Sequence, residues 1–390
     1  MSTSTTDTSA LLGVYRRSGP TFVAGEGSEL IAENGARFLD FTSGIAVSAL
    51  GYGDPDFEAA VRDALATGLV HTSNLYRTRP GAELAGWLVE HSFADRVFFC
   101  NSGAEANEGA FKFARRWART NGSDEKSGIV AFRGSFHGRT FGALAATDRA
   151  SFQEPFRPLM PGVDFVDVGN LAGLEAVSRE RTAAVIIEPI QAEGGILPVP
   201  AEFLRALRAT CDRVGALLIY DEVQVGLGRT GTLWAHEASG VTPDIMTLAK
   251  PLAGGLPMGA VLLSERVADA VQPGDHATTF GGGPLVASAA LAVCRKVGAD
   301  GFLAEVRRKG GIVSERLEAL ALAREVAAVR GTGLIWGIEL SGPATEVVAR
   351  ALDAGLLLVG AGPNVVRLVP PLSISDDDLD RGLSMLEGAL

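Results

Sequence analysis

Short apolar runs alternate with stretches of helical periodicity along the middle of the chain. In the helical stretches apolar residues recur three or four positions apart, as Phe57, Val61 and Leu65 do, which places them on one helix face. We predict strands at 96–100, 129–132, 183–188, 216–220, 245–248 and 260–264, and helices at 54–67, 80–93, 104–119 and 201–214. Apolar strands separated by helices are typical of an α/β fold with a mainly parallel sheet that helices cover on both faces.

The two ends of the chain have a different pattern. Near the N-terminus, short strands at 28–32 and 37–41 flank an Asn34-Gly35 turn. After two long helical stretches at 285–297 and 301–322, the C-terminal part alternates shorter elements. We predict strands at 334–340, 356–358 and 365–369, with helices at 344–354 and from about 375 to the end. This C-terminal pattern indicates a smaller α+β unit.

The composition is that of a soluble globular protein, with 47% hydrophobic and 21% charged residues. The net charge is −11, and no basic stripe with interleaved aromatic residues is present, which argues against nucleic acid as a partner. The uncharged stretch at 277–294 is rich in Gly and Thr, so we expect no membrane span. We expect residues 1–10 to be a frayed tail. They lack the basic residues and apolar run of a secretory signal, so we expect a cytoplasmic protein.

Glycine and cysteine counts add two expectations. Glycine makes up 48 of the 390 residues, well above the average of about 7%, which suggests tight turns or backbone that approaches a ligand closely. Cys100, Cys211 and Cys294 form no CxxC pair and no cluster with His. We therefore expect a reducing compartment, no disulfide framework and no metal site.

Two segments place reactive side chains at strand ends. Asp221 ends the strand at 216–220 and precedes a glycine-rich loop. Ligands of α/β sheets bind at such strand ends, although an aspartate there could equally cap a turn. Lys250 follows the strand at 245–248. A partly buried lysine at a strand end is a candidate for covalent catalysis, whereas most lone lysines are merely solvated.

A third segment, Asn101-Ser102-Gly103, begins a predicted helix directly after a strand. The free N–H groups of a helix start suit a phosphate, although Ser102 or Asn101 could be a simple N-cap. Together the three segments match the needs of pyridoxal phosphate (PLP). A lysine can hold its aldehyde, an aspartate can keep its pyridine nitrogen protonated, and a helix start can bind its phosphate.

These residues give the sequence its resemblance to the class-III aminotransferases of PLP fold type I, from about Tyr15 to the last helix. The resemblance rests on the run at 221–231, with Lys250 following Asp221 by 29 positions, and on the runs at 39–47 and 71–76. The last two runs are most similar to those of family members that act on N-acetylornithine. The resemblance implies a large PLP-binding domain at 49–300. It also implies a small domain made of 301–390 and the N-terminal segment 1–48.

The resemblance also assigns roles around the cofactor. Lys250 would carry PLP and shuttle a proton, and Asp221 would pair with the ring nitrogen. Val223 and Phe136 would pack on the two ring faces, and Gln224 would bond the ring hydroxyl. The phosphate would contact Ser102, Gly103 and Ala104, together with Thr279 of a neighbouring subunit. The active site would therefore be shared within a homodimer.

For substrates, the resemblance implies binding by arginine, whose guanidinium matches a carboxylate. Arg139 would bind the substrate carboxylate, and Arg367 would take the α-carboxylate of glutamate and 2-oxoglutarate. Glu193 would pair with Arg367 while the amine donor is bound, and Thr278 is a further candidate substrate contact. No metal is implied.

The implied activity moves the terminal amino group of N-acetylornithine to 2-oxoglutarate by ping-pong chemistry, in arginine biosynthesis. Ornithine, succinylornithine, 4-aminobutyrate and a carrier-linked lysine stay open as donors. Another PLP chemistry, or a non-catalytic PLP-binding protein, is a more distant alternative. Two departures from the family pattern, Ala192 beside Glu193 and Gly283 after Gly282, put the exact substrate and the local interface geometry in question.

Overall fold

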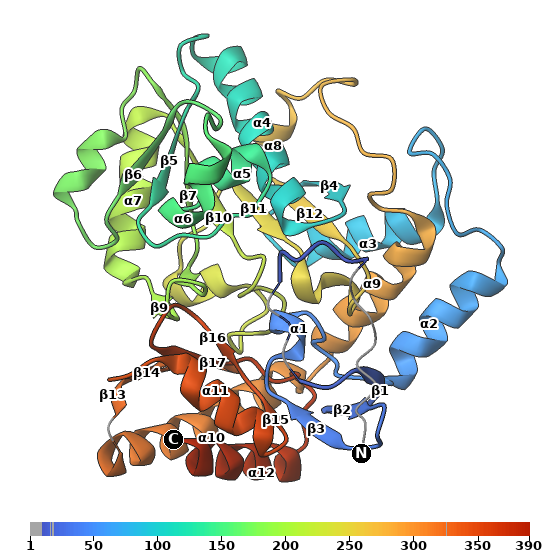
Figure 1. Ribbon diagram of the computed structural model, residues 1–390. Coiled ribbons are helices and arrows are strands. Elements are labelled where there is room, and N and C mark those ends of the chain that lie inside the picture. Colours follow the sequence, from blue (N-terminus) through green and yellow to red (C-terminus); the bar gives the residue numbers. More distant parts are fainter. Residues whose placement is uncertain (1–9, 16, 18, 325) are drawn as a thin grey trace.

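The larger part of the molecule is built on a seven-stranded sheet (Figure 1), with the strand order β4-β12-β11-β10-β7-β5-β6. The computed structural model describes residues 10–390 except Arg16, Ser18 and Glu325, so nearly all of the expected tail lies outside the described residues. The strands are β4 (Arg96–Cys100), β5 (Gly128–Phe132), β6 (Val163–Val166), β7 (Thr182–Ile187), β10 (Leu217–Asp221), β11 (Ile245–Leu248) and β12 (Gly259–Leu263). β12 is antiparallel to both of its neighbours, and the other pairs from β11 to β6 are parallel.

Helices cover both faces of this sheet. Alternate residues of β7 point to opposite faces, so that Ala184 and Ile186 belong to one hydrophobic cluster and Val185 and Ile187 to another. The first cluster is closed by α4 (Gly103–Asn121) and the second by α7 (Ala201–Val214). This two-sided burial explains why the central strands are apolar along their whole length.

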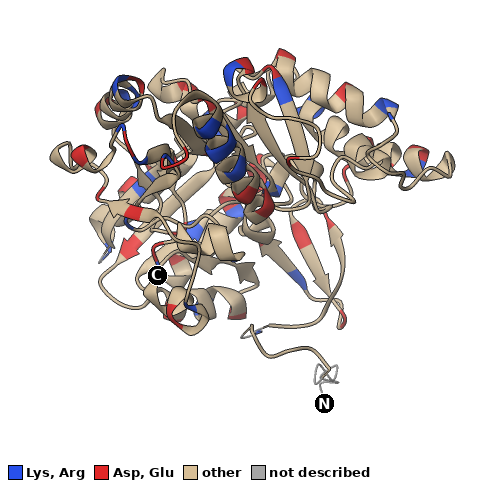
Figure 2. Ribbon diagram, turned by 90° about the horizontal axis from the view of Figure 1, so that it is seen from above, with Lys and Arg blue, Asp and Glu red and all other residues tan. Residues whose placement is uncertain are grey.

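The ends of α4 and α7 follow from local sequence. Ser102 caps the N-terminus of α4 by accepting a hydrogen bond from the N–H of Glu105 (3.2 Å). The same helix has an acidic first turn and carries Arg119 in its last turn, which suits the helix dipole. Helix α7 ends at Gly215, whose φ of +66° is the left-handed cap that glycine adopts readily. Figure 2 shows basic and acidic residues interspersed over the helices seen from above.

The smaller part contains two four-stranded sheets. One has the order β13-β14-β17-β16 and the other β1-β2-β3-β15. Their strands are β1 (Phe22–Glu26), β2 (Glu29–Ala32), β3 (Arg37–Asp40), β13 (Val326–Thr332), β14 (Ile335–Leu340), β15 (Leu356–Leu357), β16 (Val359–Gly360) and β17 (Val365–Leu368). Because β15 pairs in parallel with β3, the two ends of the chain share one sheet. Three helices lie over these sheets: α10 (Phe302–Ala323), α11 (Ala344–Asp353) and α12 (Asp376–Ala389).

The remaining elements lie outside these three sheets and the helices already named. They are α1 (Ser43–Ala46), α2 (Pro55–Ala66), α3 (Arg79–Glu90), α5 (Phe141–Ala145), α6 (Ala150–Gln153), α8 (Glu265–Ala268), α9 (Pro284–Val297), β8 (Ile190–Gln191), β9 (Leu197–Pro198) and the short 3-10 helices η1 (Glu154–Phe156), η2 (Ala172–Ala176), η3 (Ala235–Ser239) and η4 (Lys250–Ala253). Helix α9 packs against α2 and α3.

The α/β fold class with a mainly parallel sheet is confirmed, and the strands and helices predicted from the sequence lie within a few residues of their predicted bounds. Among the strands longer than two residues, the sequence analysis missed β1, β6 and β13. Strand β6 is a short edge strand with Asp164 in its middle, so it lacks the continuous apolar run that marked its neighbours. The domain bounds at 48 and 300 stay a prediction.

Three further observations concern the described residues alone. None of their helices is both long and apolar enough to cross a membrane. They include no group of three or more His, Cys, Asp or Glu side chains placed to hold a metal ion. The three cysteines are free and buried, and burial raises the pKa of the Cys100 and Cys211 thiols to about 12.

Candidate active site

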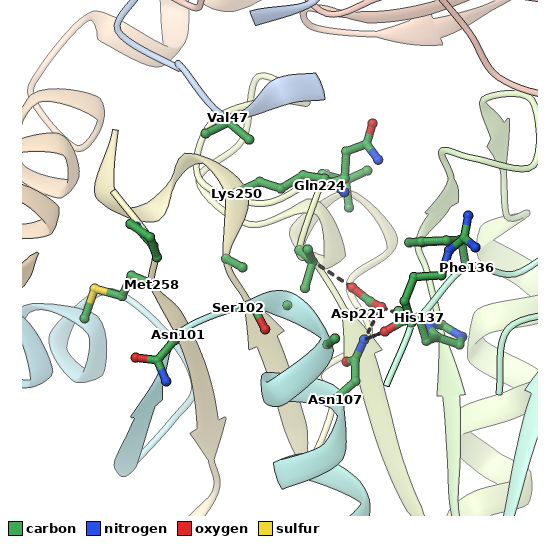
Figure 3. A pocket seen from close by; sticks show the side chains of 18 of the residues that line it. Val47, Asn101, Ser102, Asn107, Phe136, His137, Asp221, Gln224, Lys250 and Met258 are labelled. Carbon is green, nitrogen blue, oxygen red and sulfur yellow. Dashed lines mark hydrogen bonds and ion pairs between the residues drawn. The ribbon is translucent and has the colours of Figure 1, made fainter. Parts of the chain in front are cut away.

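A cavity of about 390 Å³ lies where the carboxyl ends of β10 and β11 meet the N-terminus of α4 (Figure 3). It brings together residues from six separate parts of the sequence. From the predicted set, the cavity is lined by Ser102, Gly103, Ala104, Phe136, Arg139, Asp221, Val223, Gln224 and Lys250. Such a position at strand ends is where α/β sheets bind their ligands.

Lys250 points into this cavity from the start of η4, directly after β11. Burial lowers the pKa of its ammonium group, and the positive charge of Arg367 lowers it further, against the opposing effect of Glu193, Asp221 and Glu188. A lysine with a lowered pKa spends more time as a neutral amine, which is the form that acts as a nucleophile or a base.

Asp221 is held by three hydrogen-bond donors at the end of β10. Its Oδ2 accepts from Asn107 Nδ2 (2.8 Å) and lies 2.7 Å from His137 Nδ1, and its Oδ1 accepts from the N–H of Val223 (3.0 Å). Thr247 donates to Asn107 Oδ1 (2.8 Å), which fixes the orientation of that amide. Figure 3 shows Asn107 and His137 converging on the carboxylate. The carboxylate is thus fixed in place, at only 4% exposure.

The N-terminus of α4 forms one wall of the cavity. The N–H groups of a helix's first turn have no carbonyl partner within the helix, and α4 is 19 residues long. At Gly103 an added Cβ would lie 2.6 Å from Val223 Cγ1, so only glycine fits between this turn and the Val223 side chain. A helix start of this kind binds an anion such as phosphate.

Phe136 lies across the cavity from this wall, in the loop that follows β5. Its N–H donates to Glu188 Oε2 (3.2 Å). Burial, together with the nearby negative charge of Asp221, raises the pKa of Glu188 well above the ordinary value. Glu188 is therefore a buried carboxyl that favours its neutral form.

Arg367 and Glu193 form an ion pair beside Gln224. Arg367 Nη1 also donates to Gln224 Oε1 (2.9 Å), and Gln224 Nε2 donates to Glu193 Oε1 (3.3 Å). Burial on its own would raise the pKa of Glu193, but the charge and hydrogen bond of Arg367, with smaller effects of Lys250 and Gln224, together lower that pKa. Arg367 is 1% exposed, whereas 26% of the Glu193 side chain is exposed. The pair is thus buried on the arginine side and open on the glutamate side.

Arg139 is exposed at the rim of the cavity. Its guanidinium lies over the ring of Phe152, 3.4 Å from the centroid, in a cation–π contact. The stacking holds the charged group at the mouth of the cavity, where a carboxylate of an entering molecule would meet it.

Thr278 and Thr279 do not line this cavity. They line a second one of about 640 Å³, together with His71 and Asn74. Asn74 Nδ2 donates to the carbonyl oxygen of Thr278 (2.9 Å) and ties the two segments together. A contact of Thr278 or Thr279 with a substrate or cofactor stays a prediction.

The structure also brings in residues that the sequence analysis did not assign to the site. Asn107, His137, Glu188, Val47 and Met258 line the cavity. For Asn107 a signal was available, because it is a polar residue on the buried face of α4, next to Ala106 and Ala110. Glu188 stands at the end of an apolar strand, as Asp221 does, so a local signal was available there too, whereas Val47 reaches the cavity only through tertiary contacts.

The cavity wall fits PLP by the chemistry of its donors. A buried lysine with a lowered pKa, a fixed buried carboxylate and a helix start without room for a Cβ face one another across the same space. These groups match the aldehyde, the ring nitrogen and the phosphate of the cofactor, respectively.

Comparisons with known proteins agree with this fit. The family model "Aminotransferase class-III" matches residues 16–390. The chain is 52% identical over 382 residues to "Acetylornithine aminotransferase, mitochondrial" of Alnus glutinosa, covering 96% of this chain and 84% of that protein. It is 46% identical over 386 residues to "Acetylornithine aminotransferase" of Gloeobacter violaceus, covering 97% and 95%.

Solved structures include two informative neighbours. The N-acetylornithine aminotransferase from Stenotrophomonas maltophilia K279a superposes with a TM-score of 0.84 at 39% identity, and 96% of each chain is covered. The ornithine aminotransferase from Toxoplasma gondii ME49 superposes with a TM-score of 0.93 at 28% identity, covering 98% of this chain and 93% of that one.

Proposed function

The chain belongs to the class-III aminotransferases, which are PLP-dependent enzymes, and from this premise we propose that it acts on N-acetylornithine. It moves the terminal amino group to 2-oxoglutarate and yields N-acetylglutamate 5-semialdehyde and glutamate, a step of arginine biosynthesis. The relatives of 44–52% identity that carry the acetylornithine name support this donor. The observation that carries the two-substrate reaction is the Arg367–Glu193 pair beside Gln224.

In the proposed reaction, PLP supplies a protonated ring that draws electrons from the substrate carbon. Asp221 holds the proton on the ring nitrogen, and the hydrogen bonds from Asn107 and His137 keep its carboxylate in place. The N–H groups at the start of α4 bind the phosphate. Nζ of Lys250 removes the proton from the carbon that bears the amino group, because its lowered pKa leaves it neutral enough to act as a base.

Substrate exchange follows from the different exposure of the two arginines. Arg139, at the rim, binds a carboxylate of either substrate. While the amine donor is bound, Glu193 stays paired with Arg367 and neutralises it. When 2-oxoglutarate enters, Glu193 swings aside through its exposed side and Arg367 takes the α-carboxylate. One site thereby accepts two unlike substrates in turn.

The proposal includes a cytoplasmic homodimer in which Thr279 reaches the phosphate site of the neighbouring subunit. Two exposed apolar side chains support this assembly, because one lines the second cavity and the other follows Thr279, which also lines it. Leu75 is 89% exposed and Phe280 65%, although both are large and apolar. An exposed apolar cluster of this kind marks an interaction surface.

A panel of amine donors tests the proposed donor. With the purified holoenzyme and 2-oxoglutarate, we expect N-acetylornithine to have the highest kcat/KM among N-acetylornithine, ornithine, N-succinylornithine and 4-aminobutyrate. Ornithine is the main competitor, since the ornithine aminotransferase fold superposes with a TM-score of 0.93. A ranking led by another donor would replace the proposed substrate. Continued product formation beyond one turnover per site without 2-oxoglutarate, or full turnover in Lys250→Ala, would remove the proposed mechanism.

A further inference from the structure

Arg229 is a buried guanidinium without an acidic partner among the residues that the structure describes. Its exposed fraction is 1%, and burial lowers its pKa to about 9. Nη1 donates to the carbonyl oxygens of Leu334 (3.0 Å) and Pro370 (2.5 Å), while Nη2 has no partner there. Since an unpaired buried cation is costly, an uncharged residue would serve packing better at this position.

The two carbonyls lie at one end of the strand pair that carries Arg367. Leu334 immediately precedes β14, and Pro370 is the second residue after β17. The two strands are antiparallel, with Gly337 opposite Arg367, so the start of β14 and the end of β17 are neighbours. The guanidinium of Arg229 therefore joins the two strands three residues beyond Arg367.

The chain after β17 is held on several sides, and Arg229 makes the contact at Pro370. Pro370 and Pro371 lack an N–H, so their carbonyls are the only backbone groups that can bond there. Val369 is fixed from the opposite side, because its N–H donates to the oxygen of Phe41 (2.8 Å) and its oxygen accepts from Ser43 Oγ (2.5 Å). The hydrogen bond from Arg229 Nη1 fixes the carbonyl oxygen of Pro370.

We infer that Arg229 is a positioning residue for acceptor binding, which keeps the end of β17 in the place where Arg367 can exchange Glu193 for the α-carboxylate of 2-oxoglutarate. The inference rests on the proposed function. It predicts that changing Arg229 impairs the acceptor half-reaction and spares the donor half-reaction. The donor half-reaction uses Arg139 and leaves Arg367 paired with Glu193. A residue that merely stabilised the fold would affect both halves alike.

The test uses the holoenzyme and three variants. Arg229→Met removes both hydrogen bonds at similar length, and Arg229→Lys keeps one donor and the charge. Lys309→Met is the matched control, since Lys309 is also a buried cation that donates to a carbonyl of the same C-terminal stretch, that of Ile374 (2.5 Å). The two half-reactions are followed separately by the cofactor absorbance. Binding of the non-reactive dicarboxylate glutarate is measured by calorimetry.

For Arg229→Met we expect glutarate to bind with a Kd about tenfold higher or more, and the KM for the acceptor to rise by a similar factor, because small misplacements of a binding group are costly. The donor half-reaction should stay within about twofold of the wild type. Arg229→Lys should recover part of the loss, and Lys309→Met should show no selective loss. An equal loss in both half-reactions, unchanged glutarate binding, or the same selective loss in Lys309→Met would each overturn the inference.

Two outcomes separate this inference from the proposed function. If the wild type fails to pass an amino group to 2-oxoglutarate, the proposed function fails whatever the variants do. If the wild type does so and the variants show no selective loss of acceptor binding, only the inference fails. Should Arg229→Met not fold, Arg229→Lys decides the question, since a glutarate Kd equal to that of the wild type then contradicts the role.

Discussion

Glu188 is a buried carboxyl in the cavity wall with one hydrogen-bond donor, the N–H of Phe136. Its pKa is raised by burial and by Asp221. The folded chain therefore keeps a proton that the unfolded chain loses once the pH passes the ordinary value of 4.5. Folding becomes less favourable through this group as the pH rises from 4.5 towards the raised pKa.

We therefore predict that Glu188→Gln, which cannot ionise but keeps an acceptor for Phe136, is more stable than the wild type at neutral pH. The gain should be absent near pH 4 and should widen as the pH rises. Each tenfold change in proton affinity is worth about 1.4 kcal/mol. Denaturant unfolding of both apo-proteins across this pH range measures the gain.

Glu222 offers the matched comparison for this prediction. It is equally buried but accepts from three donors, the N–H groups of Ala235 (2.6 Å) and His236 (2.8 Å) and the ring Nδ1 of His236 (2.9 Å). Glu222→Gln should destabilise the protein at neutral pH, because it removes charge-assisted hydrogen bonds. A gain of Glu188→Gln over the wild type that shrinks as the pH rises would contradict the argument.

Glu108 holds the backbone that follows Arg139. Its Oε1 accepts from Thr140 Oγ1 (2.7 Å) and from the N–H groups of Gly142 (2.7 Å) and Ala143 (3.1 Å). We predict that Glu108→Ala raises the KM for both the amine donor and the acceptor about tenfold, because Arg139 serves both substrates. Glu108→Gln should be milder, since it keeps the acceptor oxygen. Steady-state kinetics would contradict the role if the KM for only one substrate rose.

For single residues, the sequence predicts those that carry the chemistry more readily than those that hold them in place. Asp221 and Lys250 stand at the ends of apolar strands, and that position is visible in the sequence. Glu188 also follows an apolar strand, but only the folded chain shows that the Phe136 N–H, 52 residues earlier, donates to it. Gln224 was expected to face the ring hydroxyl, and its observed bonds to Glu193 and Arg367 depend on β17 being nearby.

The N-terminus of α4 is an element whose function depends on one missing side chain. At Gly103 a Cβ would press on Val223, which lines the same cavity. We predict that Gly103→Ala lowers the affinity for PLP about tenfold or more, because either the helix start or Val223 must move. The measurement is a PLP titration of the apo-protein by absorbance or by fluorescence quenching.

Gly311→Ala in α10 is the control for that variant. This glycine is also helical, but an added Cβ would meet nothing within 4 Å. It should leave PLP binding unchanged and stabilise the fold by about 0.5–1 kcal/mol, since alanine favours the helix. Equal PLP affinity in Gly103→Ala and the wild type would show that the close approach of α4 and Val223 does not matter.

Strands with a continuous apolar run and helices with regular apolar periodicity could be predicted from the sequence. The left-handed turn at Ser43–Ala46 could not. Residues Ser43, Gly44, Ile45 and Ala46 all have positive φ, between 40° and 65°. Such a conformation costs about 1–2 kcal/mol for each residue other than glycine, so local preference argues against it. It is held by Asp40, whose Oδ1 accepts from the N–H groups of Thr42 (2.7 Å) and Ser43 (3.0 Å). The turn carries the chain to Val47 in the cavity wall.

For the whole molecule, the open question is how the second cavity relates to the first. Thr278 and Thr279 lie in the second cavity, away from Lys250. Leu75 and Phe280 are exposed beside it. These observations have a common explanation if the second cavity of one subunit faces the active site of its partner across an isologous interface. In that case each complete site draws Lys250 from one chain and Thr279 from the other.

Mixed dimers test this arrangement directly. Lys250→Ala and Thr279→Ala homodimers should each lose activity, the first almost completely. A heterodimer of the two has one site with both defects and one site with neither, because its Lys250 and Thr279 come from different chains. Refolding an equal mixture should therefore restore about one quarter of wild-type activity, since half of the dimers are mixed and each has one intact site of two. A mixture of Lys250→Ala with Asp221→Ala is the control. Each site takes both of these residues from the same chain, so in the heterodimer one site lacks Lys250 and the other lacks Asp221, and no intact site forms. The first mixture could instead be no more active than the average of its two homodimers. Thr279 would then serve the active site of its own chain, or no active site.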